Sequence, residues 1–350
     1  MNALRNSFPS SPLQKIDDTL LETRNIRLFL KRDDLLHLSF SEILFGEKKI
    51  PPSVISYLSM ISGNKLRKMK YNLLEMDKMG LKRLVTFGGA FSNHIHATAA
   101  AGQLFGFETM GLIRGERSPN LSPTLRFAEE CGMTFKFINR SDYRDKNLII
   151  NELKTKLDNF YYLPEGGSNN LALRGTAEIV GEIDNEIDGQ LDDTASRYIC
   201  VPCGTGGTIA GIVAAAKEPT HVLGFSALKG DFLQKDVTSL LQNAQNAADT
   251  EGTLFSLNDS KIPQNWSINT NFHCGGYARF TPELIEFINN FKEKHNVPLD
   301  PIYTGKMLLG IYKLVETGFF PQNSTIIAVH TGGLQGIEGF NQRFGDLLLV

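Results

Sequence analysis

Residues 197–216, RYICVPCGTGGTIAGIVAAA, combine the three parts on which the fold prediction rests. RYICV is typical of a buried strand, GTGGT of a tight loop, and the apolar run from Ile209 to Ala216 of a helix. Because the loop's N–H groups and threonine hydroxyls lie at a helix start, they can bind a phosphate. The loop lacks the Gly-Lys-Ser/Thr of a P-loop, and Ile209 replaces the third glycine of the dinucleotide fingerprint. A small phosphorylated ligand is therefore favoured.

Similar strand-like segments alternate with helical runs along most of the chain. This alternation predicts an α/β fold with open, twisted, mostly parallel sheets and helices on both faces. Three further strands run into glycine, in VTFGGAFSN, YYLPEGGSN and AVHTGG, and ligands bind beyond the carboxyl ends of such strands. Tight turns use glycine for steric reasons alone, so each loop is weak evidence by itself. The strands are expected in RLFLK (27–31), RLVTF (83–87), TMGLI (109–113), TFKFI (134–138), FYYLP (160–164), RYICV (197–201), HVLGF (221–225) and TIIAVH (325–330).

Composition places the chain among ordinary globular proteins. Of its 350 residues 41% are hydrophobic and 21% charged, and the formal net charge is −2. A charge so near zero gives no reason to expect a nucleic-acid or anionic-membrane partner. No apolar run is long enough to cross a bilayer, and residues 1–18 lack the apolar stretch of a secretory signal. We therefore expect a cytoplasmic protein.

The chain has four cysteines, too few for a disulfide framework at this length. Cys200 and Cys203 form a C-x-x-C, which occurs in zinc sites and redox pairs. Since no second ligand pair follows at a suitable spacing, we expect no metal site and interpret both as buried strand residues.

Residues 36–61 do not follow the alternation of strands and helices: they contain Pro51-Pro52 and no clear period, and are interpreted as an irregular insertion.

The segment SGNKLRKMKYNLLEM (62–76) places Lys65 at the start of a predicted helix. A cation is unfavourable there because the N-terminal end of a helix carries partial positive charge. A lysine that forms an imine with an aldehyde would be better suited to the position.

The segment GGAFSNHIHATAAAG places Ser92, Asn93 and His94 at the start of another helix. Ser92 or Asn93 can cap this helix, and together with the helix N–H groups the three side chains can bind a carboxylate. His96 faces elsewhere on the helix and is interpreted as structural. A lysine, a phosphate cradle and a carboxylate site are together what pyridoxal 5'-phosphate (PLP) catalysis on an amino acid requires.

The sequence also resembles the 1-aminocyclopropane-1-carboxylate deaminase / D-cysteine desulfhydrase family of PLP enzymes, which have the tryptophan-synthase-β-like fold of type II. The resemblance rests on LFLKRDDLL, SGNKLRK, GGAFSNH, EGGSN, GTGGTIAG, LDPIYTGK and HTGG, in the family's order and over nearly the whole chain. It implies a homodimer, a smaller α/β domain at residues 66–168, and a larger PLP-binding domain formed by 1–65 and 169–350.

The resemblance also implies residue roles. Lys65 would be the Schiff-base lysine, Lys68 would help hold the phosphate, and Asn93 would hydrogen-bond the cofactor's ring hydroxyl. Ser92, Asn93 and His94 would bind the substrate carboxylate, and Ser92 could also act as acid, base or nucleophile. Two catalytic tyrosines would flank the substrate. The phosphate cradle would consist of Gly204, Thr205, Gly206, Gly207 and Thr208, and the tyrosines would be Tyr277 and Tyr303.

Two positions discriminate between the family's reactions. The cyclopropane deaminases resemble YEGK and HLGG where this chain has Thr304 and Thr331, and SNQ where it has His94. A threonine at the pyridine nitrogen gives a weaker electron sink than a carboxylate would. We therefore expect β-elimination from a small amino acid, D-cysteine first, to pyruvate, ammonia and hydrogen sulfide. The alternatives are cyclopropane ring opening and a non-catalytic protein that binds PLP or a phosphorylated metabolite.

Overall fold

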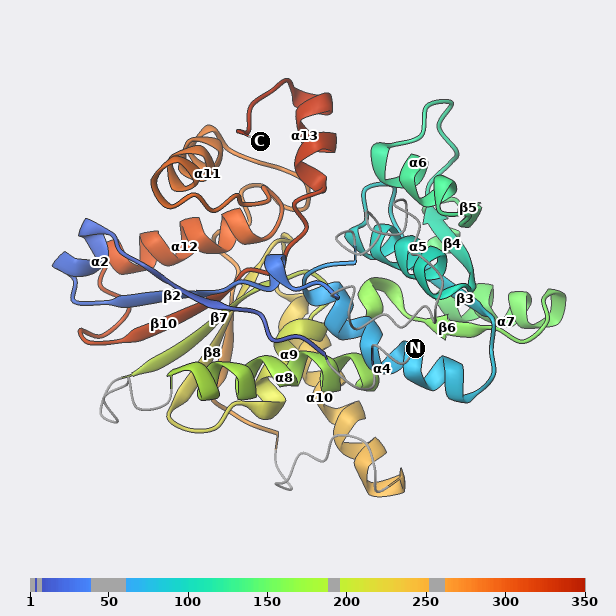
Figure 1. The fold of residues 1–350 in the computed structure, drawn as a ribbon, viewed down its shortest axis with the longest axis horizontal. Coiled ribbons are helices and arrows are strands. Elements are labelled where there is room, and N and C mark those ends of the chain that lie inside the picture. Colours follow the sequence, from blue (N-terminus) through green and yellow to red (C-terminus); the bar gives the residue numbers. More distant parts are fainter. Residues whose placement is uncertain (1–3, 5–7, 39–60, 188–195, 252–261, 350) are drawn as a thin grey trace, which may run out of the picture.

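Two parallel sheets stand side by side in the computed structural model, which describes residues 4, 8–38, 61–187, 196–251 and 262–349 (Figure 1). All pairings are parallel except that of the first two strands of the larger sheet. The larger sheet has the order β1 (Leu13–Ile16), β2 (Arg27–Lys31), β10 (Thr325–Val329), β7 (Arg197–Cys203), β8 (Thr220–Ser226), β9 (Trp266–Asn269). The smaller has the order β5 (Thr134–Ile138), β4 (Glu108–Arg114), β3 (Arg83–Gly88), β6 (Tyr161–Leu163).

Helices cover both faces of the larger sheet, because successive strand residues point to opposite sides. On one face Leu28, Ile326 and Ala328 pack with one set of helices, and on the other Ile327 and Val329 pack with a second set. The first set is α2 (Thr19–Thr23), α11 (Pro282–His295), α12 (Thr304–Glu316) and α13 (Gly336–Phe344); the second is α8 (Asn170–Ile187), α9 (Gly207–Ala215) and α10 (Phe232–Glu251).

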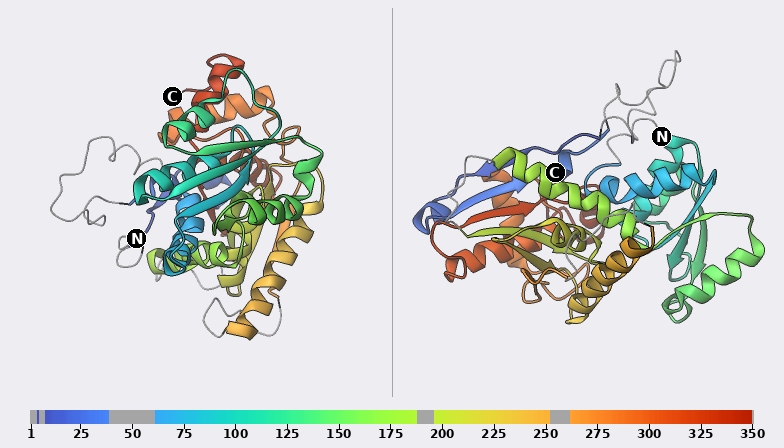
Figure 2. Two further views of the ribbon diagram at one scale, coloured as in Figure 1. Left: turned by 90° about the vertical axis from the view of Figure 1, so that its right-hand side faces the viewer. Right: turned by 90° about the horizontal axis from the view of Figure 1, so that it is seen from below.

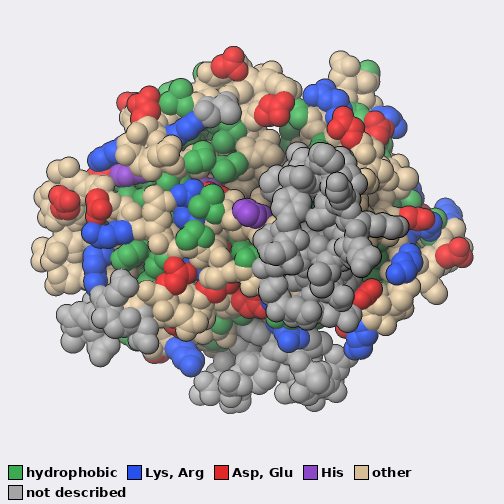
Figure 3. Space-filling view, viewed as in Figure 1, with side chains coloured by type: hydrophobic (Ala, Val, Ile, Leu, Met, Phe, Trp, Pro, Cys, Tyr) green, Lys and Arg blue, Asp and Glu red, His purple; other side chains and the backbone are tan. Residues whose placement is uncertain are grey.

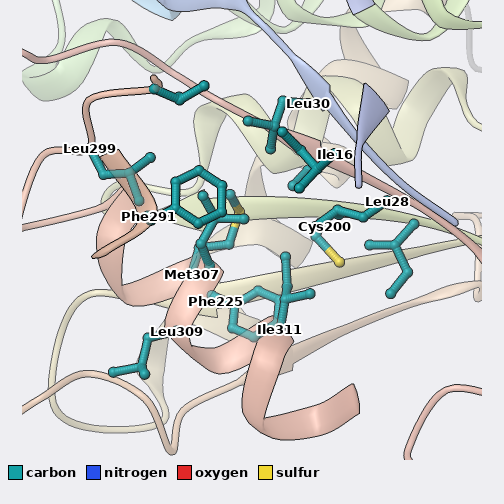
Figure 4. Packing of buried hydrophobic residues seen from close by; sticks show 14 of the residues in the cluster. Ile16, Leu28, Leu30, Cys200, Phe225, Phe291, Leu299, Met307, Leu309 and Ile311 are labelled. Atoms are coloured by element: carbon teal, nitrogen blue, oxygen red, sulfur yellow. The ribbon is translucent and has the colours of Figure 1, made fainter. Parts of the chain in front are cut away.

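The same alternation separates Cys200 from Cys203. Cys200 packs among Leu28, Phe225 and Ile311 on the first face (Figure 4), whereas Cys203 belongs to the core on the second. Burial raises the pKa of both thiols. The two residues are therefore buried strand residues, as expected, and the sheet itself lies between them. Among the described residues, no group of three or more His, Cys, Asp or Glu side chains could hold a metal ion.

The smaller sheet is covered in the same way, and α4 connects it to the larger one. Leu66 and Leu73 of α4 pack against Leu84 of β3, while α4 also lies against α8 of the larger unit. The right-hand view of Figure 2 shows the larger and the smaller sheet one after the other along the long axis of the molecule. The helices of this unit are α4 (Asn64–Lys78), α5 (Asn93–Phe105), α6 (Pro123–Glu130) and α7 (Lys146–Lys156), and short 3-10 turns occur at Asp33–Leu35, Asp142–Arg144 and Glu165–Gly167.

The predicted α/β class and its eight strands are confirmed, with two differences. The segments TFKFI and FYYLP are not fully buried: they form the two edges of the smaller sheet, where Ile138 and Leu163 are the buried strand residues. Two short strands, β1 and β9, were not predicted. The strands of the smaller sheet fall within 66–168, and the domain boundaries themselves stay a prediction. Most of the 36–61 insertion lies outside the described residues.

Basic and acidic side chains are intermingled on the face shown in Figure 3. Of the described helices, none is both long and apolar enough to cross a membrane.

Candidate active site

A cavity of about 620 Å³ opens where the carboxyl ends of strands from both sheets meet. Its walls come from the segments that follow β3, β4 and β6 of the smaller sheet and β7 and β10 of the larger. This is the position at which open α/β sheets bind ligands. The volume lies in the range of small-molecule sites, on the order of 300–1,000 Å³.

Lys65 lies in the first turn of α4, as predicted, and lines this cavity. The preceding Gly63 has φ 71°, and a Cβ built there would lie 2.5 Å from the carbonyl oxygen of Thr331. Glycine is therefore required where the chain enters the helix. Lys65 Nζ donates to Asn64 Oδ1 at 3.1 Å, and Asn64 Nδ2 donates to Thr208 Oγ1 at 3.0 Å. These contacts connect the lysine to the glycine loop.

Burial makes the two cavity lysines weaker bases. It lowers the pKa of Lys65 to about 8, and the charge of Asp300 opposes this shift. Burial, followed by repulsion from Lys65, lowers the pKa of Lys68 well below its usual value. An amine with a pKa near 8 is unprotonated in about a tenth of the molecules at pH 7, far more than at the ordinary lysine pKa, and a nucleophile or general base must be unprotonated.

The GTGGT loop forms a cradle beside Lys68. Lys68 Nζ donates to the carbonyl oxygen of Gly166 at 3.1 Å and to Ser168 Oγ at 3.3 Å. A Cβ on Gly207 would lie 2.4 Å from Ser168 Oγ and 2.9 Å from Lys68 Nζ, so only glycine fits. Gly204, Thr205, Gly206 and Thr208 line the cavity; Gly207 lies behind them at the start of α9.

Ser92 and Asn93 line the cavity at the start of α5. Ser92 Oγ accepts from the N–H of Ile95 at 3.3 Å, which confirms it as the helix cap. Its own O–H remains available to donate to a ligand. Asn93 Oδ1 accepts from Gln335 Nε2 at 3.1 Å across the cavity. A hydroxyl, an amide and free helix N–H groups therefore line one wall.

His94 also lines the cavity but is turned toward the sheet. Thr86 Oγ1 donates to the carbonyl oxygen of Leu163 at 2.8 Å, so it accepts from His94 Nε2–H, also at 2.8 Å. The buried Nδ1 has no hydrogen-bond partner, and burial lowers the pKa of the imidazole well below its usual value. Nδ1 of this neutral ring has no proton to donate, so the carboxylate contact of His94 stays a prediction. His96 stacks on Phe127 at 4.1 Å between ring centroids and does not line the cavity.

Tyr277 and Tyr303, which were predicted to flank the substrate, pack against each other in the cavity, and their catalytic role stays a prediction. Their ring centroids are 6.2 Å apart, and both line the cavity. Burial raises the pKa of both hydroxyls, and the two side chains share a hydrogen bond. Both phenols therefore stay protonated near neutral pH and can donate a proton.

Thr304 does not line the cavity, in contrast to the expectation that it contacts the cofactor. It is the first residue of α12, and its hydroxyl donates to Asp300 Oδ2 at 2.5 Å. The reason is local: Asp300 also accepts from the N–H groups of Ile302, Tyr303 and Thr304, so the carboxylate caps the helix start and draws the hydroxyl toward it. Thr331 does line the cavity.

Several site residues were not predicted from the sequence. Asn64 and Asp300 occur within the SGNKLRK and LDPIYTGK motifs, so proximity to those motifs was an available signal. Ser168 occurs in the EGGSN motif, so the same signal was available for it. Arg114, at the end of β4, has no motif around it and could be found only from the structure.

These features fit PLP. The glycine cradle with Lys68 provides a phosphate site, Lys65 provides an amine of lowered pKa for covalent attachment, and the start of α5 provides a carboxylate site. A Cβ built on Gly207 would lie 2.9 Å from both Ser168 Cβ and Lys68 Nζ, so a side chain there would displace the groups beside the phosphate site; this is the decisive geometric observation.

Comparison with known proteins agrees with the geometry. Residues 56–332 match the family model described as pyridoxal-phosphate dependent enzyme. The chain belongs to this family.

Among relatives, a bifunctional D-cysteine desulfhydrase/1-aminocyclopropane-1-carboxylate deaminase of Arabidopsis thaliana, described as mitochondrial, is 29% identical over 305 residues, 82% of this chain and 73% of that protein. A crystal structure described as an ACC deaminase homologue superposes with a TM-score of 0.75 at 23% identity, covering 97% of this chain and 95% of the other. A hydrogen sulfide-producing enzyme of Fusobacterium nucleatum superposes with a TM-score of 0.61 at 13% identity, over 96% and 99%. The two structures establish the fold alone.

Because the chain belongs to the family of pyridoxal-phosphate dependent enzymes, PLP is the enzyme's cofactor.

Proposed function

We propose that the enzyme catalyses β-elimination from a small amino acid, with D-cysteine the first candidate. In this reaction D-cysteine and water give pyruvate, ammonia and hydrogen sulfide. The observation that carries the proposal is that one cavity unites Lys65, the start of α5 and the glycine cradle. The name of the Arabidopsis relative supports the substrate.

The chain's own groups have distinct roles in this reaction. PLP, when bound, supplies an electron sink for negative charge that develops at the substrate Cα. Ser92, Asn93 and the first N–H groups of α5 bind the carboxylate and fix the orientation of the Cα–H bond. Lys65 Nζ, with its pKa near 8, accepts the Cα proton. The protonated Tyr277–Tyr303 pair donates a proton to the leaving thiolate.

The glycine loop and Lys68 would hold the cofactor phosphate, and Asn93 would hold its ring hydroxyl. Thr331 faces the cavity, and residue 304 is a threonine rather than a glutamate. Of the described carboxylates that line the cavity, Glu165 is bound to Lys146 and Asp236 lies on α10 at the phosphate end. Asp34 and Asp300 lie near the Gly332–Gly333 turn that follows Thr331, but neither lines the cavity. A cavity whose lining has Thr331 and no carboxylate at this point favours elimination over ring opening, which needs the stronger sink.

The test compares keto-acid release from D-cysteine, L-cysteine, D-serine and 1-aminocyclopropane-1-carboxylate. Turnover of D-cysteine well above the cyclopropane compound is expected. The reverse order would establish ring opening to 2-oxobutanoate and ammonia, the second activity in the name of the Arabidopsis relative. If amino acids neither release ammonia nor change the cofactor's visible spectrum, the protein is a non-catalytic binder.

A homodimer and a cytoplasmic location are part of the same proposal. Light scattering of the holoenzyme tests the first, and fractionation of cells that express the full chain tests the second.

A further inference from the structure

The cavity has charged residues at its mouth that the proposed reaction does not use. Arg114 is the last residue of β4, Lys146 begins α7, and Glu165 follows β6. All three line the cavity. They lie on the smaller unit, on the same side as the start of α5.

Lys146 and Glu165 neutralise each other. Lys146 Nζ lies 2.8 Å from Glu165 Oε2, and the hydroxyl of Tyr143 donates to Glu165 Oε1 at 3.0 Å. Both oxygens of Glu165 are thus occupied, and its charge is balanced within the pair. Glu165 therefore does not compensate a second cation.

Of the three charged residues at the cavity mouth, Arg114 is the one whose charge is not balanced within a pair. Its guanidinium carbon lies 5.8 Å from the ring centroid of Tyr143, and Nη2 lies 3.8 Å from a Cβ built on Gly89, in the loop that leads to Ser92. Within the described ranges it has neither a carboxylate partner nor a hydrogen bond. Its charge acts on Tyr277, where it opposes the burial that raises the pKa of that hydroxyl. Arg114 is exposed to solvent and lines the cavity from the end of β4 in the smaller unit.

The other cations and donors of the cavity already have an anion to bind. The cofactor phosphate belongs to the glycine loop and Lys68, and the substrate's α-carboxylate belongs to Ser92 and Asn93. A guanidinium beside that carboxylate site, which stacks on Tyr143 but has no anionic partner among the described residues, is suited to a third anion.

We propose that Arg114 binds a negatively charged group at the end of the substrate side chain: the thiolate of cysteine, or the carboxylate or sulfonate of an acidic amino acid. This inference rests on the amino-acid site of the proposed function, but not on the elimination step. It makes Arg114 a specificity-determining residue.

The experiment compares aspartate with asparagine, which have nearly the same shape and differ in side-chain charge. Both enantiomers of each are titrated into the PLP-loaded enzyme, and binding is followed by the change in the cofactor's absorbance. Arg114→Gln removes the charge. Arg117→Gln is the matched control, since Arg117 lies nearby but pairs with Glu129 and does not line the cavity.

One enantiomer of aspartate should bind about tenfold more tightly than the corresponding asparagine, the scale of one charge-assisted hydrogen bond. Arg114→Gln should reduce this ratio to about 1 by weakening aspartate alone, and Arg117→Gln should preserve it.

Three results would overturn the inference: no preference for aspartate in the native enzyme, equal weakening of both ligands by Arg114→Gln, or loss of the preference in Arg117→Gln. Equal weakening would assign Arg114 to the α-carboxylate instead. Failure of the proposed function is distinguishable, because it appears as absent keto-acid release from D-cysteine while the preference for aspartate persists.

Discussion

Lys65 and Arg67 are only two positions apart on α4, but their side chains have opposite surroundings. Lys65 faces the cavity, and burial lowers its pKa to about 8. Arg67 points behind the cavity into a buried cluster, where Nη2 contacts Asp33 Oδ1 at 2.8 Å and Nη1 contacts Glu182 Oε1 at 2.6 Å. These carboxylates more than offset the burial of Arg67, so its pKa is raised. The same helix thus carries one cation with little compensation, suited to chemistry, and one fully paired, suited to fixing the helix in place.

The paired cluster joins three distant segments. Ser11 Oγ donates to Asp33 Oδ1 at 2.6 Å, and Lys31 Nζ lies 3.0 Å from Glu182 Oε2 on α8. Residues from the N-terminal segment, the end of β2 and α8 therefore converge on Arg67. Because Arg67 is only two residues from Lys65, this cluster fixes the start of α4 relative to the larger sheet.

The largest expected effect separates chemistry from stability. Lys65→Met should abolish covalent PLP attachment and lower the rate of keto-acid release by about a thousandfold or more, since the general base is lost as well. Borohydride reduction and peptide mapping should place the pyridoxyl mass on the Lys65 peptide of the native enzyme. The free energy of unfolding of the cofactor-free protein should stay the same or rise, because a poorly compensated buried amine is removed.

Lys78→Met is the control for this change, because Lys78 is exposed near the end of the same helix. Pyridoxyl label on another lysine of the native enzyme would contradict the assignment of Lys65.

Arg67→Met should have the opposite profile. It leaves Asp33 buried without its partner, so the free energy of unfolding should fall by about 3–5 kcal/mol. Arg83→Met, which breaks the more exposed pair with Glu108, should cost about 1 kcal/mol or less. Urea denaturation measures both. Equal costs would show that the cluster contributes no more than a surface pair.

Acid should weaken the cluster specifically. Arg67 and then Lys31 outweigh the burial of Glu182 and lower its pKa from 4.5 to about 2. A carboxyl whose folded-state pKa is depressed stabilises the protein above its unfolded-state pKa, and this contribution is lost as the pH falls through the folded-state value. The unfolding free energy should therefore decrease between about pH 4.5 and pH 2. In Glu182→Gln, which has less stability to begin with, that slope should become shallower; an unchanged slope would assign it to other carboxyls.

The difference between the two sides of α4 also explains what could be predicted from the sequence. Strand-and-helix alternation identified eight strands, and glycine at the strand ends located the cavity, because both follow from local patterns. β1 and β9 are four residues each and lack a distinctive period, so pairing with long neighbours makes them strands. The partners of Arg67 are distant in sequence, and no local pattern indicates them.

Within the site, the sequence predicted which residues occur but not the direction in which their side chains point. The motif around Thr304 was informative, but the residue type did not reveal that Asp300, four positions earlier, would hold its hydroxyl away from the cavity. Arg114 is the converse: it occurs in no motif, yet the end of β4 directs it to the cavity mouth.

The smallest expected effect concerns the electrostatic link between Asp300 and Lys65. Since the nucleophilic amine must be unprotonated, the rate of PLP attachment to the cofactor-free enzyme should rise with pH around a midpoint near 8. The charge of Asp300 raises the pKa of Lys65, so Asp300→Asn should move the midpoint to lower pH. Thr304→Val is the control, because it removes one donor but keeps the carboxylate charge. Attachment rates are measured by absorbance after PLP is mixed with each variant. A midpoint near 10.5, the ordinary lysine value, would mean that burial does not tune Lys65, and the contrast with Arg67 would then lose its electrostatic basis.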